Sequence, residues 1–257
     1  MQILSAHLLE SYREKIDFSL LDSMNTNADE EISFDYFDFY SSESSVYSSK
    51  IEGETIEADS YFKYKLLHVD FQGDLTKKID DLFNAYSFIK SNALTFENVI
   101  NAHELLSGNL LPKSQQGKIR TNLIYVFNEK SQIEYFAATP ETAEAELEKL
   151  FSNIDFLLNK NLSAEEVFFY ASQIHLVFVK IHPFNDGNGR TARLLEKWFL
   201  ISKFGENAFS VPLERNYYQN LQQYYSNIKK LGLEYDELDY SKALDFLLMT
   251  PFSLKND

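Results

Sequence analysis

The chain has 257 residues, 44% of them hydrophobic, with only 8 Gly and 5 Pro, a balance typical of a mainly helical domain with a sizeable core. Its formal net charge of −15 at pH 7 argues against nucleic acid or an anionic membrane as the main partner. Without cysteine, the chain cannot form disulfides. Its first residues lack a basic segment followed by an apolar one, and no apolar run approaches about 20 residues, so we expect a soluble cytoplasmic protein.

The N-terminal part of the chain, residues 1–47, is predicted to hold a short helix followed by an extension. Within it, residues 23–47 are rich in Ser, Asn and acidic residues, yet they include Phe34, Phe37 and Phe39. This composition is too aromatic for a simply disordered segment. We therefore expect a linker that packs on the core.

The segment from Ser48 to Gly53 reads Ser-Ser-Lys-Ile-Glu-Gly. It is predicted to form one turn of helix that ends at the glycine. Taken alone, such a segment is most simply a capped helix on the surface.

A β-hairpin is predicted in the middle of the chain. The stretches 121–127 and 132–137 alternate in a strand-like way around a short turn. The hairpin should span about residues 121–137. Thr139 and Pro140 suit the cap and first turn of the helix that follows.

Two apolar helices are predicted further along, joined by a loop. Hydrophobic residues recur at helical spacing over residues 167–181, and Pro183 disfavours the α conformation at His182, so the first helix should end there. The second helix is predicted to begin at about Arg190. The loop between them therefore lies between two buried helices.

His175 lies seven residues before His182, on nearly the same helical face, which raises the question of a metal site. Zinc ligands on a helix are spaced three or four residues apart and need further partners, and this chain has no cysteine. We expect His175 to be a hydrogen-bonded core residue instead.

The loop reads His-Pro-Phe-Asn-Asp-Gly-Asn-Gly-Arg over residues 182–190. Gly187 and Gly189 allow positive φ angles, so successive backbone N–H groups can form an anion-binding concavity at the start of a helix. Arg190 and Arg193 stand in the first helical turn, where the helix dipole favours acidic residues. A bound anion would remove that conflict. The pattern therefore indicates a site for a nucleotide polyphosphate.

Residues 182–193 resemble the signature HxFx(D/E)GNGRxxR of the Fic (filamentation induced by cAMP) domain, with each defining position present. The resemblance covers about residues 48–250. It implies a mainly α fold, a Fic-type helical bundle with a small β-hairpin flap beside the active site. It also implies an enzyme that transfers AMP from ATP to a hydroxyl of a target protein.

The resemblance implies catalytic roles for residues of the loop. His182 corresponds to the general base that takes the proton from the incoming hydroxyl, a task that suits an imidazole with a pKa of about 6.5. Asp186 corresponds to the ligand of Mg²⁺, a hard cation that prefers carboxylate oxygen. Phe184 points the other way as an apolar anchor. Taken alone, His182 and Asp186 would be a core histidine and an ordinary turn aspartate.

The implied nucleotide-binding residues surround the phosphates and the base. The glycine-flanked turn would cradle the phosphates, Arg193 would take the γ-phosphate, and a tyrosine pair would lie near the adenine and ribose. In a chain with 16 Tyr and 22 Phe, however, aromatic residues at helical spacing are more often core than part of a nucleotide site. The set comprises Gly187, Asn188, Gly189, Arg190, Arg193, Tyr217 and Tyr218.

Ser48, Glu52 and Gly53 fit the pattern (S/T)xxxE(G/N), which resembles the inhibitory motif of the Fic class with an N-terminal inhibitory helix. A bidentate pair between Glu52 and Arg193 would occupy the guanidinium that the γ-phosphate needs. The predicted units are therefore the extension 1–47, the inhibitory helix with its following helix 48–68, the catalytic core 69–250 and the C-terminal tail 251–257.

The sequence thus predicts a protein adenylyltransferase that uses ATP and Mg²⁺, modifies a Ser, Thr or Tyr hydroxyl of a protein target, and is inhibited by Glu52. The resemblance also allows a homodimer. Two alternatives stay open. The same fold could remove AMP, with Glu52 orienting water, or transfer another phosphate-containing group. The chain could also be a non-catalytic nucleotide-binding regulatory module, which the presence of His182 disfavours.

Overall fold

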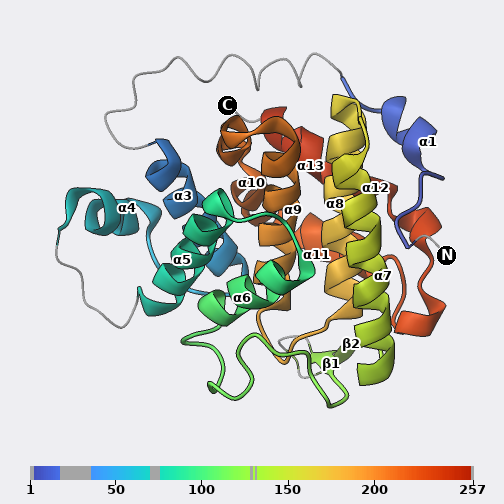
Figure 1. Ribbon diagram of the computed structural model, residues 1–257, viewed down its shortest axis with the longest axis horizontal. Coiled ribbons are helices and arrows are strands. Elements are labelled where there is room, and N and C mark those ends of the chain that lie inside the picture. Colours follow the sequence, from blue (N-terminus) through green and yellow to red (C-terminus); the bar gives the residue numbers. More distant parts are fainter. Residues whose placement is uncertain (1–2, 18–35, 70–75, 128–129, 131, 256–257) are drawn as a thin grey trace.

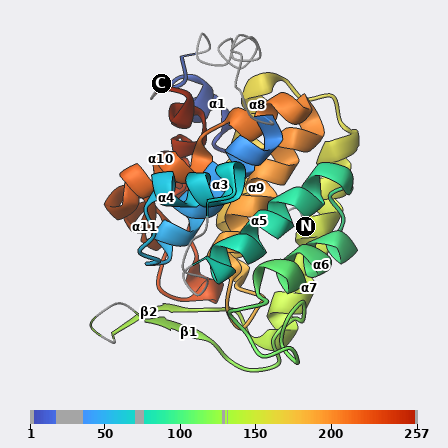
Figure 2. The same ribbon diagram turned by 90° about the vertical axis from the view of Figure 1, so that its left-hand side faces the viewer.

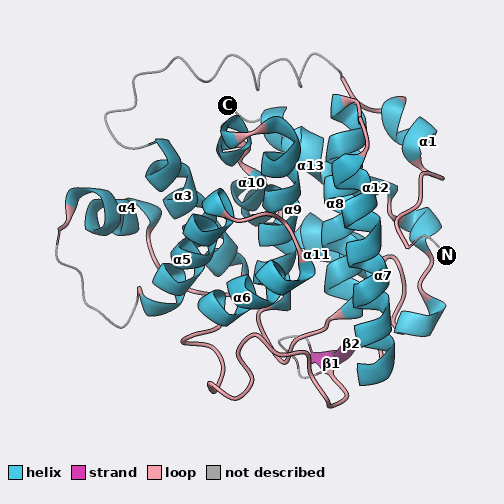
Figure 3. Cartoon of the chain, in the orientation of Figure 1, coloured by secondary structure: helices cyan, strands magenta, loops and turns pink. Residues whose placement is uncertain are grey.

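The computed structural model describes residues 3–17, 36–69, 76–127, 130 and 132–255. Helices dominate these residues, and one small hairpin is the only sheet among them (Figures 1 and 3). The helices are α1 (Leu9–Arg13), α3 (Tyr36–Ile51), α4 (Ala58–Leu67), α5 (Lys77–Ser91), α6 (Phe96–Leu106), α7 (Pro140–Asn159), α8 (Ala164–Ile181), α9 (Asn188–Phe204), α10 (Leu213–Gln219), α11 (Leu221–Lys229), α12 (Leu244–Leu247) and α13 (Met249–Phe252). The predicted fold class, a mainly α bundle with a small hairpin, is confirmed.

The core is built around α8 and α9, which lie side by side in the middle of the molecule (Figure 1). Helix α8 starts at a capping box in which Glu166 accepts the backbone N–H of Ser163 at 2.9 Å. Every side chain over residues 167–178 of α8 and 190–200 of α9 is buried. Because these helices are covered on all sides, the loop between them is held at both ends by deeply buried helices.

The other helices cover this central pair. Helix α7 lies along α8, and α6 lies against α9 with α5 beside it (Figure 1). Helix α3 lies between α5 and α10 and also touches α9, which brings its C-terminal end toward the N-terminus of α9. The segment before the predicted catalytic core is therefore part of the bundle.

The hairpin projects from one end of the bundle (Figure 2). Strands β1 (Tyr125–Phe127) and β2 (Ile133–Phe136) pair antiparallel, with Tyr125 opposite Phe136 and an irregularity between Val126 and Phe127. The strands are shorter than the predicted stretches, and most of the turn that joins them lies outside the described residues.

The structure corrects the expected linker. Residues 36–47 belong to α3, which runs without a break across the predicted boundary at residue 47, and Phe37 is buried. Residues 23–35 of the expected linker lie outside the described part of the chain. In the expected tail, Pro251 and Ser253 are buried, so at least part of it belongs to the bundle. None of the described helices is both long and apolar enough to cross a membrane.

Truncating a side chain of the central pair should cost much more stability than truncating one at the surface. Phe168 is 0% exposed and Phe156 is 56% exposed. We expect Phe168→Ala to lower the free energy of unfolding by about 3–5 kcal/mol and Phe156→Ala to change it by less than about 0.5 kcal/mol. Urea unfolding of both variants checks this, and equal losses would contradict the assignment of the core.

Candidate active site

His182 closes helix α8 and begins the loop. It adopts a left-handed conformation, with φ 56° and ψ 58°. The following proline disfavours the right-handed α conformation at this residue, and the helix ends at Ile181 as predicted. Its Nδ1 lies 3.1 Å from the carbonyl oxygen of Val179. A carbonyl only accepts, so Nδ1 carries the proton of the neutral ring and Nε2 keeps its lone pair. The ring is therefore in the tautomer that a base at Nε2 requires.

The loop is held in shape by its own residues. The side-chain amide of Asn188 accepts from the backbone N–H of Phe184 at 2.9 Å and donates to its carbonyl at 2.8 Å. Phe184 is fully buried, as expected for an anchor, and its ring stacks on His103 at 3.6 Å. Asn188 was expected to cradle phosphates, but here its side chain organises the loop and only 2% of the residue is exposed.

The two glycines of the loop serve different purposes. Gly187 has a φ of 79° and precedes α9, whereas Gly189 is already helical, so the expectation of positive φ holds for Gly187 alone. A Cβ at Gly189 would lie 2.5 Å from Oε1 of Glu52. The missing side chain of Gly189 is thus what lets Glu52 approach the start of α9.

Arg193 is fully buried beside the end of α3. Its Nε donates to the Ser48 hydroxyl at 2.8 Å, and its Nη2 donates to the Ser48 carbonyl at 3.1 Å and to Oε1 of Glu52 at 2.6 Å. Its Nη1 donates to the Tyr224 hydroxyl at 3.2 Å. The expected contact between Glu52 and Arg193 therefore exists in the structure. It uses one carboxylate oxygen rather than the bidentate geometry we expected, and Ser48 and Tyr224 accept from three of the other four N–H donors.

A second carboxylate reaches the first turn of α9. Oε1 of Glu54 lies 3.7 Å from Nη2 of Arg190 and 2.7 Å from Nζ of Lys78. Arg190 is only 4% exposed, and its Nε is among the buried polar atoms without a partner in the described residues. Both arginines that the helix dipole disfavours thus meet carboxylates from the segment after α3. Sequence reasoning missed Glu54, because nothing in its spacing points to Arg190.

Burial and the neighbouring groups shift the pKa values of Glu52 and His182. Partial burial opposes the charge of Glu52, but Arg193 and Arg190 together outweigh it and lower the pKa of its carboxyl. Burial lowers the pKa of His182 to about 4, although the Val179 carbonyl opposes the shift. Near pH 7 the site therefore holds an ionised Glu52 and a neutral His182.

Asp186 faces solvent at the tip of the loop. Its Oδ1 accepts the backbone N–H of Gly187 at 2.6 Å, which orients the carboxylate. Mg²⁺ prefers one or two carboxylates with phosphate oxygens and waters over an all-protein cage. In the described residues no cluster of three metal-binding side chains occurs. A single exposed and oriented carboxylate fits a metal that is held mainly by substrate phosphates.

The structure does not bring Tyr217 to the loop. Tyr217 is fully buried, and its hydroxyl donates to the Glu196 carboxylate at 2.9 Å. Tyr218 is half-buried and lies near Tyr47 of α3, with ring centroids 5.7 Å apart. The tyrosines beside the arginines come one helical repeat later: Tyr224 contacts Arg193, and Tyr225 donates to the carbonyl of Ile51 at 3.0 Å.

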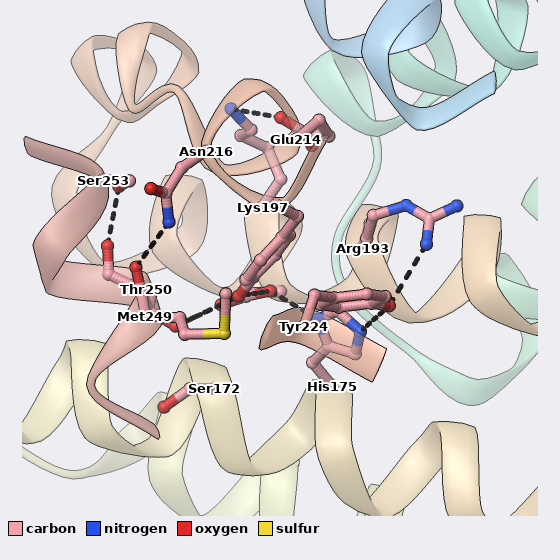
Figure 4. A network of polar contacts seen from close by, with 12 residues as sticks. Ser172, His175, Arg193, Lys197, Glu214, Asn216, Tyr224, Met249, Thr250 and Ser253 are labelled. Atoms are coloured by element: carbon pink, nitrogen blue, oxygen red, sulfur yellow. Dashed lines mark hydrogen bonds and ion pairs between the residues drawn. The ribbon is translucent and has the colours of Figure 1, made fainter. Parts of the chain in front are cut away.

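Behind Tyr224 a buried chain of polar groups runs into the core (Figure 4). Nε2 of His175 lies 3.0 Å from the Tyr224 hydroxyl, and Nδ1 lies 2.6 Å from Oε2 of Glu196. Glu196 also accepts from Tyr217 and Thr250. His175 is thus the hydrogen-bonded core residue we expected. This network of polar groups links Arg193 to α8, α9 and α13.

Helix α3 is anchored a second time, further from the loop. The Ser44 hydroxyl donates to Oε2 of Glu214 at 2.9 Å, and Tyr86 of α5 donates to Oε1 at 2.6 Å. Lys197 of α9 lies 3.2 Å from the same carboxylate (Figure 4). Glu214 therefore ties the middle of α3 to α5 and α9.

The geometry can be compared with known proteins. Residues 93–200 match the Fic/DOC family. The chain carries a Fic/DOC domain. Over 129 residues, 50% of its length, it is 33% identical to the protein adenylyltransferase fic-1 of Caenorhabditis briggsae, and over 135 residues it is 30% identical to the protein adenylyltransferase Fic of Nematostella vectensis. These matches cover 24% and 29% of the two relatives, so the chain spans about a quarter of their length.

Solved structures share the fold of the Fic domain and much of what surrounds it. A Fic family protein from Desulfovibrio desulfuricans superposes with a TM-score of 0.76 at 17% identity, covering 99% of this chain and 75% of that one. Fic-1 from C. elegans superposes with a TM-score of 0.69 at 19% identity, covering 96% and 72%.

The buried residue His103 should make the stability of the protein depend on pH. Burial lowers the pKa of His103 to about 4, although the Asp186 carbonyl opposes the shift. The unfolded chain then binds more protons than the folded one between about pH 6.5 and pH 4, so this contribution is present near pH 7 and lost as pH falls. The parent should lose about 2 kcal/mol more than His103→Gln between pH 7 and pH 4.5. Urea unfolding at both pH values checks this, and an equal loss in the free energy of unfolding for the parent and His103→Gln would contradict it.

Proposed function

We propose that the chain is a protein adenylyltransferase, which transfers AMP from ATP to a Ser, Thr or Tyr hydroxyl of a protein target. The observation that carries the proposal is the pairing of a neutral His182, whose Nε2 lone pair is available, with two buried arginines at the adjacent helix N-terminus. A base next to a polyphosphate site is what nucleotidyl transfer needs. The relatives named protein adenylyltransferase support the same reaction.

In the proposed reaction, Nε2 of His182 takes the proton of the target hydroxyl. The hydroxyl oxygen then forms a bond to the α-phosphorus, and the bond from that phosphorus to the oxygen bridging to the β-phosphate breaks, so that pyrophosphate leaves. The backbone N–H groups at the start of α9, together with Arg190 and Arg193, would offset the charge of the phosphates. These groups lie on a rigid helix, so little reorganisation is needed when the charge shifts.

Asp186 is the residue that would hold Mg²⁺, with its carboxylate oriented by the N–H of Gly187. The metal would neutralise phosphate charge and orient the polyphosphate. The exposed position of Asp186 at the loop tip leaves room for the substrate phosphates beside it.

We propose further that the described conformation is inhibited. The two N–H groups of Nη2 of Arg193 donate to the Ser48 carbonyl and to Glu52, so neither faces an open position for a γ-phosphate. Glu52 also brings a negative charge to the place where the phosphates would lie. ATP could then bind productively only after the end of α3 moves. In activation, this movement would therefore precede ATP binding.

The role of His182 can be tested by transfer measured in the Glu52→Gly background. We expect His182→Ala to lower the rate of self-modification by about 10²–10⁴ while the affinity for ATP stays within about threefold, because the base acts on the hydroxyl and not on the phosphates. ATP labelled at the α-phosphate reports transfer, and calorimetry reports binding. The exposed His7→Ala is the control. If the Glu52→Gly, His182→Ala double variant modified itself as fast as Glu52→Gly alone, the assignment of His182 would be wrong.

The inhibitory contact can be tested by a double-mutant cycle. Glu52→Gly should tighten ATP binding by roughly 10- to 100-fold, because a charge-assisted contact of about 1.5–3 kcal/mol becomes available to the γ-phosphate. Adding Arg193→Ala should remove most of the gain. Equal gains with and without Arg193 would exclude the pairing.

A charge control separates that contact from the general field of the acidic chain. Glu52→Gln and Glu57→Gln each remove one negative charge, but Glu57 is exposed at the start of α4. Only Glu52→Gln should increase ATP affinity and self-modification. A similar increase in both variants would show that net charge, and not the contact with Arg193, limits ATP binding.

A further inference from the structure

Arg120 is a buried cation that serves no role in the reaction described above. It is 1% exposed and lies between the loop and the two ends of the hairpin. Its Nε donates to the carbonyl of His182 at 2.7 Å, its Nη1 donates to the carbonyl of Asn122 at 2.6 Å, and its Nη2 donates to the carbonyl of Ala138. One guanidinium therefore joins three separate backbone segments.

The backbone of Arg120 adds a fourth contact. Its N–H donates to the carbonyl of Pro183 at 2.9 Å, so two successive loop carbonyls are held by the same residue. In the part of the chain that the structure describes, the charge of Arg120 is balanced by carbonyl dipoles and not by a carboxylate, and burial lowers its pKa. Burying an arginine in this way is costly, which points to a task beyond stability.

The contact with His182 bears on the geometry of the base. A non-glycine residue with a φ of 56° is strained and stays in that conformation only when its surroundings hold it. The N–H of His182 bonds to Phe178, its ring bonds to Val179, and its carbonyl accepts from Arg120. Arg120 is the only one of these three partners that lies outside α8. It is therefore the partner through which another element can affect the orientation of the imidazole.

The other two contacts bear on the hairpin. Asn122 precedes β1 and Ala138 follows β2, so the guanidinium holds both ends of the hairpin at once. The exposed residues Tyr125, Phe127 and Ile133 lie on the strands between them. Any segment that pairs with this hairpin would thus stand at a defined distance from the loop.

We propose that Arg120 is a positioning residue that locks the hairpin to the backbone of His182, so that a hydroxyl presented on the hairpin and the base that deprotonates it move as one unit. This inference rests on the proposed transfer reaction for its kinetic consequence but not for its structural one. Lysine at this position keeps the charge but offers a single ammonium, which cannot reach three carbonyls at once.

The kinetic test uses Arg120→Lys in the Glu52→Gly background. We expect kcat for self-modification to fall roughly 10- to 100-fold, because a small misplacement of base and acceptor slows the chemical step, whereas KM for ATP stays within about twofold. Lys118→Gln, an exposed change two residues earlier, should alter neither constant. Unchanged kcat in Arg120→Lys, or a loss of ATP affinity in step with kcat, would overturn the proposal.

Hydrogen exchange tests the lock without relying on the reaction. In Arg120→Lys the amides of the hairpin and of residues 182–184 should exchange roughly tenfold faster, while those of α8 before residue 178 and of α9 keep their protection. Faster exchange throughout the bundle would mean that Arg120 serves stability alone and would overturn the proposal. If Glu52→Gly shows no transfer with labelled ATP, the proposed function fails, and the exchange pattern still decides the role of Arg120.

A measurement on the parent covers the case in which Arg120→Lys does not fold. The Nε–H of Arg120 should exchange slowly in ¹⁵N NMR spectra, since it is buried and bonded to the His182 carbonyl, and Arg215, whose side chain is 41% exposed, supplies the fast reference. Exchange of the Arg120 Nε–H at the rate of Arg215 would overturn the proposal.

Discussion

The buried guanidinium of Arg193 is the constraint on which the site depends. Arginine does not lose its charge, so once it is removed from water its donors must all find acceptors. Here the acceptors come from two remote segments, Ser48 and Glu52 at the end of α3 and Tyr224 on α11. Helix α3 is thereby drawn against the N-terminus of α9. A γ-phosphate could satisfy the same donors, and this competition connects the fold to the proposed regulation.

The hydrogen bonds behind Arg193 have one consistent direction. Arg193 donates to the Tyr224 hydroxyl, and the His175 ring can accept from Tyr224 at Nε2 while it donates to Glu196 at Nδ1. Glu196 is fully buried and is satisfied by donors from three helices. An arginine bonded from behind in this way would keep the contact with Tyr224 if the contact with α3 were released. The proposed activation therefore requires a movement of the end of α3 and none of Arg193.

The local features of the loop were predictable because they depend on neighbours in sequence. Pro183 ends α8 at Ile181, and the apolar ring of Phe184 turns into the core. The β-hairpin and the helix that Thr139 caps were foreseen for the same reason, since turn and cap chemistry are local. The expected positive φ at Gly189 was wrong, because that residue already lies inside α9. Its missing side chain instead leaves room for Glu52, which is distant in sequence.

The sequence by itself determined the mainly helical class, the loop between two buried helices and the likeness to the Fic domain, because periodicity, proline and a long ungapped signature depend on neighbours in sequence. Only the tertiary structure decided which groups meet across the bundle. It placed Glu54 beside Arg190 and Tyr224 on Arg193, it buried Tyr217 in the core, and it set Arg120 between the hairpin and His182. Those contacts join segments far apart in the chain, so their partners follow from how the helices stack and from no spacing in the sequence.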